Sequence, residues 1–340
     1  MEMKKARNIE IIRQLSLLFL LLLEIILFSL LAERFFSFSN AISILRQVSV
    51  TGISAMGMFM IILLGDIDLS VGSMYAFIGV VSALIFKTTE SAVLAIIAAL
   101  VIGTGIGFIN GTITARFKIP AFITTLATMS VCSGFAYIIT KGTPIGVTNP
   151  AFTFLGSGYI AGVIPLPIIF MLIVLALGYF TMYKTRFGRH IYACGGNAQA
   201  AKWSGINADK IKVLVFVIAG FLNGFAAIVL AGRLGGGLPS AGDGSEMDVI
   251  TAVVLGGTSM TGGKGKLWGV VLGVLIIGVL TVGLTMVGVS TYWQNVIKGV
   301  IIVAAVIIDT KGTKTAGTQE EYTHENNGRR NISGHRQVGL

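Results

Sequence analysis

Long apolar stretches separated by short polar ones dominate the chain. Windows without a single charged residue cover 47–65, 69–86, 91–115, 119–140, 142–183, 213–232, 249–263 and 267–297. A helix that crosses a bilayer needs about 20 residues with few or no charges. The pattern therefore predicts an all-α integral membrane protein.

Glycine and proline divide the longest windows. Those between Gly142 and Gly158 predict a loop before a helix near 164–182, and Gly288 separates two helices in the last window. The window 249–263 is short and ends in glycines, so we expect it to cross only in part or to re-enter. With an apolar run near the N-terminus, about ten transmembrane helices are expected, near 15–32, 48–64, 70–86, 91–109, 120–140, 164–182, 213–231, 249–261, 267–286 and 291–308.

A basic segment with Lys4, Lys5, Arg7 and Arg13 precedes the first apolar run. Signal peptides begin in the same way. The run is longer than the usual core of a signal peptide, and no A-x-A site follows it. We therefore favour an uncleaved first helix.

The Lys and Arg residues indicate the orientation. With the N-terminus in the cytoplasm, 19 of the 25 lie in segments on the cytoplasmic side and 5 on the other side. This follows the positive-inside rule, so both termini are expected in the cytoplasm. The expected organisation is a cytoplasmic N-terminus (1–14), a transmembrane domain (15–309) with a cytoplasmic loop at 184–212, and a disordered cytoplasmic tail (310–340).

Composition narrows the class further. Hydrophobic residues make up 54% of the 340 residues and charged residues 12%, which excludes a soluble globule and a disordered chain. The 44 glycines beside only 6 prolines fit close helix packing in a membrane. The net charge of +10 lies in short groups between apolar runs, which suits anionic lipid and not nucleic acid. Cys132 and Cys194 are expected to be free thiols.

Several chemistries lack their sequence signatures. There is no Walker A loop, because Thr258 and Gly265 stand where the motif around Lys264 needs a glycine and a hydroxyl. The glycines at 103–107 lie inside an apolar helix, where close helix contact explains them better than nucleotide binding. The segment 66–77 fails the EF-hand pattern, and no metal site or nucleophile–base pair is evident. We expect no enzymatic activity and no cofactor bound by this chain.

The polar segment Gly65-Asp66-Ile67-Asp68-Leu69-Ser70-Val71-Gly72-Ser73 joins two apolar spans. Carboxylates at membrane depth are costly unless they are satisfied. In one interpretation Asp68 or Ser70 caps the next helix and the glycines allow the turn. In the other the segment lines a solute path or gate, since non-helical backbone at this depth must be buried in protein or line water.

A second glycine-rich segment, 255–264, shares three identities with 64–73. This is weak evidence of an internal repeat. Broken helices at corresponding positions of two halves nonetheless point to a transport pathway.

The basic loop 184–212 contains a candidate short helix. Asn197 is a good N-cap, 198–204 is a good helix and Gly205 is a good C-terminal stop. Such a helix either rests on lipid headgroups or docks a cytoplasmic partner, and these residues do not decide between the two.

Isolated polar residues occur within the spans. Glu24 and Lys298 are ionisable, which suggests function by default, although a buried pair or a polar helix contact explains them equally. Four amides suit either hydrogen bonds between helices or contact with a polar solute: Asn110, Asn223, Gln294 and Asn295.

Three of these segments resemble the signatures of one family. The run from Gly65 to Ser73 resembles the G-G-I-D-L-S-V-G-S signature of ribose-type permeases, the membrane subunits of bacterial ABC importers for simple sugars. The coupling segment of these permeases resembles Gly195-Gly196-Asn197, Ala200 and Ser204-Gly205-Ile206-Asn207. Their third signature resembles 252–259 followed by 262–265. The similarity extends from about Phe35 to Asp309.

The resemblance implies a division of labour between chains. Two permease subunits, identical or different, would form the path in the bacterial inner membrane. Two cytoplasmic ATPase subunits, which hold ATP and magnesium, would dock on the short helices, and a periplasmic or lipid-anchored binding protein would deliver the sugar. The implied docking residues are Gly195, Gly196, Asn197, Gln199, Ala200, Ala201, Gly205 and Ile206. The candidate path or gate residues are Asp66, Asp68, Ser70, Gly72, Asn110, Gly256, Gly257, Thr258 and Ser259.

Two departures from the family pattern affect these roles. Asp66 replaces the second glycine of the first signature and adds a charge. Gln199 stands where the broader permease pattern has a glutamate, which removes the carboxylate for a salt bridge to the ATPase. The individual sugar stays open among ribose-like pentoses, hexoses and autoinducer-2.

Two other functions compete with this one. An ion-coupled secondary transporter would need ion ligands inside the membrane, for which Glu24, Asp66 and Asp68 are the candidates. A scaffold or receptor that transports nothing would leave the polar breaks without a role.

Overall fold

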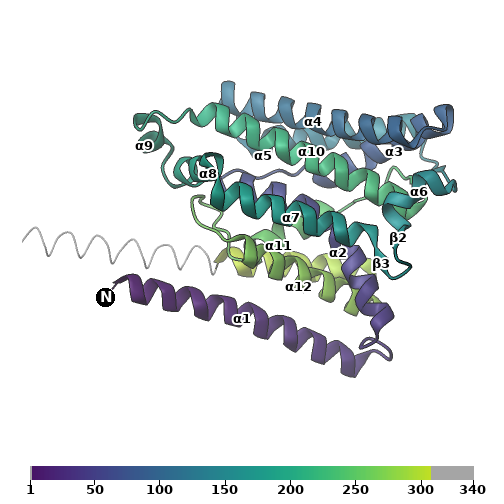
Figure 1. Ribbon diagram of the computed structural model, residues 1–340, viewed down its shortest axis with the longest axis horizontal. Helices are drawn as coiled ribbons and strands as arrows, with labels where there is room; N and C mark the ends of the chain where they lie inside the picture. Colours follow the sequence, from purple (N-terminus) through teal and green to yellow (C-terminus); the bar gives the residue numbers. More distant parts are fainter. Residues whose placement is uncertain (1, 308–340) are drawn as a thin grey trace, which may run out of the picture.

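The computed structural model describes residues 2–307 as a bundle of helices with short strands at one end (Figure 1). The expected tail at 310–340 lies outside the described residues. The elements are α1 (Glu2–Leu31), α2 (Phe38–Leu63), α3 (Val71–Thr89), α4 (Ala92–Arg116), α5 (Ala121–Thr140), β1 (Ile145–Gly146), α6 (Pro150–Ser157), β2 (Tyr159–Ile160), β3 (Ile164–Pro165), α7 (Leu166–Lys184), α8 (Arg186–Gly196), α9 (Ala198–Trp203), α10 (Ala208–Leu234), β4 (Gly236–Gly237), α11 (Ser245–Leu255) and α12 (Leu267–Met286). A further helix, Thr291–Ile307, follows α12.

Eight of the described helices are long and apolar enough to cross a membrane: α1, α2, α3, α4, α5, α7, α10 and α12. They correspond to eight of the ten expected spans. The other two expected spans, 249–261 and 291–308, contain shorter helices, α11 with 11 residues and Thr291–Ile307. Gly257, with a φ of +94°, follows the end of α11. The count of ten full spans is therefore not confirmed. In the window 249–261 the helix ends at Leu255, in agreement with the expectation that this short window does not form a full span.

The helices α2 and α10 form the centre of the bundle. α2 packs against α7, α10, α11 and α12, and α10 packs against α2, α3, α4 and α6. Phe59 and Ile61 of α2 and Val215 and Phe216 of α10 are fully buried. Because lipid tails are as apolar as these side chains, close packing rather than exclusion from water holds the helices together.

Glycines bring α4 and α10 into backbone contact. Gly103, Gly107 and Gly111 recur every fourth residue on α4 and face the segment of α10 that contains Phe216 and Gly220. A Cβ on Gly107 would lie 2.2 Å from the Phe216 carbonyl oxygen, and one on Gly103 would lie 2.4 Å from that of Gly220. The interpretation of the glycines at 103–107 as a helix contact thus holds for Gly103 and Gly107, whereas Gly105 of the same run has no neighbouring segment within 4 Å.

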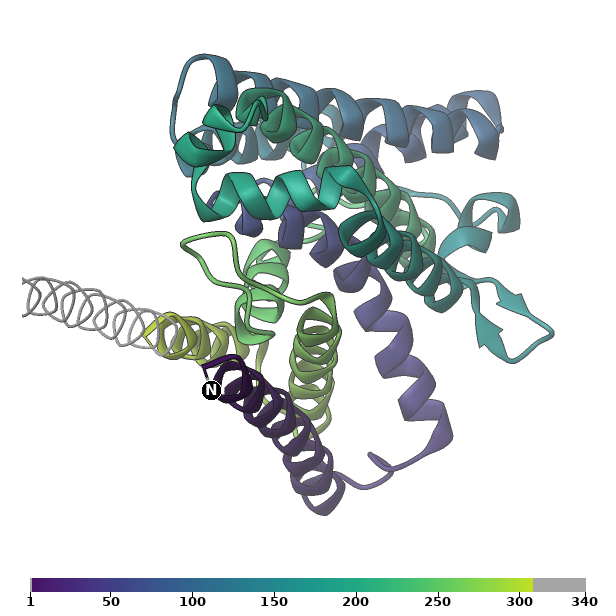
Figure 2. The same cartoon turned by 60° about the vertical axis from the view of Figure 1, so that its left-hand side comes forward.

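The first helix is part of the bundle. The Phe28 ring of α1 lies over Gly283 of α12, where a Cβ would be 2.3 Å from the ring. Figure 2 shows α1 and the helix Thr291–Ile307 on the side of the bundle away from α4. The expectation of an uncleaved first helix stays a prediction.

The expected loop between 142 and 163 folds into a cap at one end of the bundle. β1 pairs with β4 in an antiparallel ladder, and β2 pairs with β3 in the same sense. α6 reaches the end of α10 closely, because a Cβ on Gly156 would lie 2.0 Å from the Arg233 backbone nitrogen. This cap lies at the opposite end of the bundle from α8, α9 and the start of α1 (Figure 1).

The glycine contact between α4 and α10 gives a matched pair of variants. We expect Gly107→Ala to destabilise the protein by roughly 1–3 kcal/mol, because its methyl group meets the Phe216 backbone. A methyl group on Gly105 of the same helix would have no neighbouring segment within 4 Å, and Gly105→Ala should stabilise by up to about 1 kcal/mol. Thermal unfolding in detergent, followed by size-exclusion chromatography, measures both. Equal melting temperatures would contradict the close contact.

Candidate functional site

The first break, residues 64–70, is a non-helical segment between α2 and α3. Gly65 has a φ of +78°, a conformation that suits glycine. Asp68 is buried, and its Oδ1 accepts the Ser70 backbone N–H at 2.8 Å and the Ser70 hydroxyl at 2.6 Å. α3 begins at the next residue, so Asp68 satisfies donors directly ahead of the helix. α3 has no side-chain cap bond, so Asp68 holds the turn ahead of the helix and the predicted capping bond is not formed.

Side chains from α4 and α5 hold this break in place. The Leu69 backbone N–H donates to the Thr125 hydroxyl at 3.0 Å. Thr128 donates to Asn110 Oδ1 at 2.5 Å, and the Asn110 amide nitrogen lies 3.5 Å from the Ser70 hydroxyl. Ser70 in turn donates to Asp68. The hydrogen bonds therefore form a series that ends at the Asp68 carboxylate. The contacts of Asn110 are thus hydrogen bonds between helices.

The second break, residues 256–266, follows α11. Gly256 packs on α12, where a Cβ would lie 2.4 Å from the Gly269 carbonyl oxygen. Thr258 and Ser259 are buried, and the Ser259 N–H donates to the Lys264 carbonyl at 2.8 Å. These candidate path residues pack inside the subunit in the conformation described.

The first turns of α3 and α11 meet inside the bundle. A Cβ on Gly72 would lie 2.2 Å from the Gly242 carbonyl oxygen and 2.4 Å from a Glu246 carboxylate oxygen. Tyr75, in the first turns of α3, donates its hydroxyl to Ser54 at 2.6 Å. Glu246 is not among the residues predicted from the sequence. The available signal was an acidic residue in the first turn of an apolar helix.

The basic loop 184–212 contains two helices, of which α8 was not expected. α9 matches the expected helix at 198–204. The Asn197 side chain accepts the Ala200 N–H at 2.9 Å, and Gly205 has a φ of +81°, so both predicted ends of the helix are confirmed. α9 lies at the far end of the bundle, beyond α7 and α8 (Figure 1). The exposed candidate docking residues are Gly196, Asn197, Gln199, Ala200 and Gly205, whereas Ala201 is buried.

Backbone contacts join the three signature segments at a glycine junction, formed by Leu63, Gly65, Gly195, Gly262 and Gly263. The Gly263 N–H donates to the Leu63 carbonyl at 2.8 Å. A Cβ on Gly195 would lie 1.7 Å from the same carbonyl oxygen, and one on Gly262 would lie 2.8 Å from the Gly195 carbonyl oxygen. A side chain on Gly195 or Gly262 has no room at these contacts. Gly195 therefore belongs to this junction and not to the exposed face of α9.

Two tyrosines, one in α8 and one in α7, bond to the second break and to the first residue of α12. Tyr192 of α8 donates its hydroxyl to the Gly265 carbonyl at 2.9 Å, and the Leu267 N–H donates to the Tyr183 hydroxyl at 2.9 Å. Burial raises the pKa of the Tyr192 phenol, so this hydroxyl stays protonated and remains a donor. Cys194 of α8 and Cys132 are buried free thiols, as expected.

Two ion pairs hold charged side chains of the first break and of α11. Asp66 pairs with Lys212 of α10 at 2.7 Å, so the charge that departs from the family pattern has a partner. Lys298 pairs with Asp248 of α11 at 2.7 Å. This contact agrees with the interpretation of Lys298 as a member of a buried ion pair. Glu24 has a buried carboxylate oxygen without a hydrogen-bond partner among the described residues.

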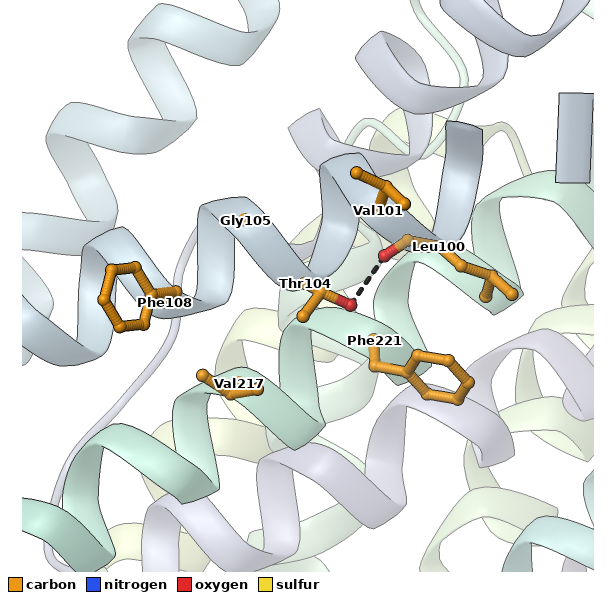
Figure 3. A pocket seen from close by; sticks show the side chains of 7 residues that line it. All are labelled: Leu100, Val101, Thr104, Gly105, Phe108, Val217 and Phe221. Atoms are coloured by element: carbon orange, nitrogen blue, oxygen red, sulfur yellow. Dashed lines mark hydrogen bonds between the residues drawn. The ribbon is translucent and has the colours of Figure 1, made fainter. Parts of the chain in front are cut away.

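A groove between α4 and α10 does not suit a polar solute. Figure 3 shows its lining, with Val101 and Phe108 from α4 and Val217 and Phe221 from α10. Its volume is about 510 Å³. The hydroxyl of Thr104 in this groove already donates to a carbonyl of its own helix at 2.6 Å. An apolar groove of this kind on the outer face of two spanning helices suits a lipid chain.

Comparisons with known proteins agree with the signatures. A family model described as a branched-chain amino acid transport system permease component matches residues 40–306. The ribose import permease protein of Haemophilus influenzae is 44% identical over 270 residues, which cover 78% of this chain and 83% of that protein. The ribose import permease protein of Escherichia coli K12 is 44% identical over 294 residues, covering 85% and 91%.

A relative with a different printed substrate also matches. The L-arabinose ABC transporter permease protein of Azospirillum brasilense is 36% identical over 271 residues, covering 80% of each chain. No solved structure matches the chain significantly.

The role of Asp68 can be tested with two substitutions. Asp68→Asn keeps an Oδ1 acceptor for both Ser70 donors, so we expect little loss of stability or uptake. Asp68→Ala leaves two buried donors unsatisfied and should destabilise by about 1–3 kcal/mol. Thermal unfolding and an uptake assay on both variants measure this. A large loss of uptake in Asp68→Asn with normal stability would contradict a purely structural role.

The glycine junction is tested by two neighbouring glycines. Gly195→Ala should lower the melting temperature strongly, or prevent accumulation of folded protein, because its methyl group meets the Leu63 carbonyl. Gly196→Ala is the matched control, since a methyl group there has no atom within 4 Å. Detergent-solubilised yield and thermal unfolding compare the two. If Gly195→Ala is as stable as Gly196→Ala, the three segments do not meet as described.

Proposed function

The chain belongs to the family of permease components of ABC importers, and from this premise we propose that it carries a simple sugar across the bacterial inner membrane as a multi-pass subunit. The relatives named for ribose and arabinose import, at 36–44% identity, support a pentose or a similar sugar. The observation that carries the proposal is a close backbone contact directly ahead of the exposed helix α9. There Gly195, near the end of α8, meets Leu63 next to the first break and Gly263 in the second. A scaffold protein would not need this arrangement.

The energy source is proposed to be a separate ATPase subunit. The sequence contains no Walker A loop, so we assign ATP and magnesium binding to that partner. A second permease subunit and a periplasmic or lipid-anchored sugar-binding protein complete the proposed assembly. The transport family membership supports a permease and not an enzyme.

We further propose that the end of the bundle with α8, α9 and the start of α1 faces the cytoplasm. The basic residues of 184–212 lie at this end, in agreement with the positive-inside rule. The capped end with β1 to β4 then faces the periplasm. The candidate docking residues on α9, among them Asn197, Gln199, Ala200 and Gly205, are thereby presented to a cytoplasmic partner.

The gate is proposed to lie where the first turns of α3 and α11 meet. The backbone of Gly72 packs so tightly against Gly242 and Glu246 that a solute has no room between them in this conformation. Opening therefore requires the first turns of α3 and α11 to separate. A displacement of α9 would reach both breaks through the glycine junction, and such rocking of a packed unit is a common way to alternate access.

Direct uptake measurements test this proposal. Reconstituted in proteoliposomes with its cognate ATPase and binding protein, the permease should take up radiolabelled ribose, arabinose or xylose only when ATP is present on the ATPase side. Uptake should persist when ionophores collapse ion gradients. Uptake that needs an ion gradient and ignores ATP would instead establish a secondary transporter, for which Asp66 is a poor ion ligand because Lys212 already pairs with it.

The coupling helix is tested by Gly205→Trp. Gly205 has a φ of +81° at the end of α9, and a bulky residue there changes the shape that the ATPase meets. We expect membrane insertion and ATP hydrolysis to remain and uptake to be lost. Unchanged ATP-dependent uptake would show that α9 is not the coupling helix.

A further inference from the structure

Trp203, the last residue of α9, is exposed to an unusual degree. It leaves 80% of its surface accessible. Among residues 184–212, all of which the structure describes, it is the single large apolar side chain exposed in this way. Tryptophan is enriched among the few residues that dominate the binding energy of protein interfaces. The coupling segment thus carries one prominent aromatic group with no place in the subunit's own packing.

The segment 184–212 that contains Trp203 is rich in basic side chains. Five basic side chains of the segment form no ion pair within the described part of the chain: Lys184, Arg186, Arg189, Lys202 and Lys210. A hollow of about 550 Å³ lies beside α9, with Gln199 and Lys202 on one wall and the ion pair of Lys118 with Asp209 on another. A complementary surface would carry carboxylates around an apolar pocket.

The geometry of α9 does not suit a helix that lies on lipid. A helix in the membrane interface needs an apolar face along its length. α9 has only six residues, its Ala201 packs against the protein, and Trp203 is its one large apolar side chain. The amphipathic helix of this segment is α8, whose Ile191 and Cys194 are buried in the subunit. A single exposed indole within a polar rim is the pattern of a protein contact.

We propose that Trp203 anchors this permease to its ATPase subunit. The indole enters an apolar pocket on that subunit, and carboxylates on the rim of the pocket face Lys202 and Lys210. This inference rests on the proposed function, which supplies the ATPase as the occupant. The residues that carry the family resemblance do not include Trp203.

Tryptophan fluorescence tests where the indole goes. The chain has three tryptophans, so Trp268→Phe with Trp293→Phe leaves Trp203 as the only tryptophan of the permease. In nanodiscs we expect strong quenching by acrylamide and none by brominated lipid. Addition of the purified cognate ATPase should shift the emission to shorter wavelength and reduce acrylamide quenching. Quenching by brominated lipid, or emission that does not change while the ATPase binds, would overturn the proposal.

Affinity measurements separate this proposal from the proposed function. Trp203→Ala should weaken ATPase binding at least about tenfold, and Trp203→Phe should restore part of it. Trp293→Ala, which removes a tryptophan of 65% exposure outside the coupling segment, is the matched control and should bind as the wild type does. Equal affinity of Trp203→Ala and wild type would overturn the anchor while leaving the permease assignment intact. Failure of the wild type to bind the ATPase would overturn both.

Discussion

Backbone that leaves helical geometry inside a membrane must find its hydrogen-bond partners within the protein, and this constraint shapes the molecule. One non-helical segment joins α2 to α3, and another follows the short helix α11. Part of the non-helical backbone finds its hydrogen-bond partner in the other segment, because the Gly263 N–H of the second break donates to the Leu63 carbonyl at the end of α2. Main chains approach this closely only where no side chain intervenes, so Gly195 and Gly262 are required by geometry.

The same contact gives the coupling segment its mechanical connection. α8 ends at Gly195 and Gly196, α9 follows directly, and the junction holds that point against both breaks. Tyr192 adds a side-chain bond to the second break, and the pair of Asp66 with Lys212 ties the first break to α10, which begins where the coupling segment ends. A partner that moves α9 therefore acts on both breaks and on a central helix together.

Sequence patterns predicted the elements whose signals are local. The apolar stretches predicted ten spans, of which eight are helices long enough to cross a membrane, and the N-cap at Asn197 and the positive φ at Gly205 follow from single residues. Contacts between segments that are distant in the sequence could not be predicted in this way. No local signal pairs Lys212 with Asp66 or places Glu246 beside the first turn of α3. The family resemblance assigned Gly195 to docking because it stands next to the docking helix, whereas its backbone serves the junction. Such roles depend on which segments meet, and spacing along one chain does not specify that.

Hydrogen exchange at a single amide tests the glycine junction most directly. Gly263 lies in a loop that would otherwise exchange rapidly, yet its N–H is held by the Leu63 carbonyl. For the protein in nanodiscs, mass spectrometry with residue-level fragmentation should show this amide exchanging as slowly as those of α2 and α10. Exchange as fast as at the exposed residues around Gly205 would contradict the junction, and with it the proposed link between the coupling helix and the two breaks.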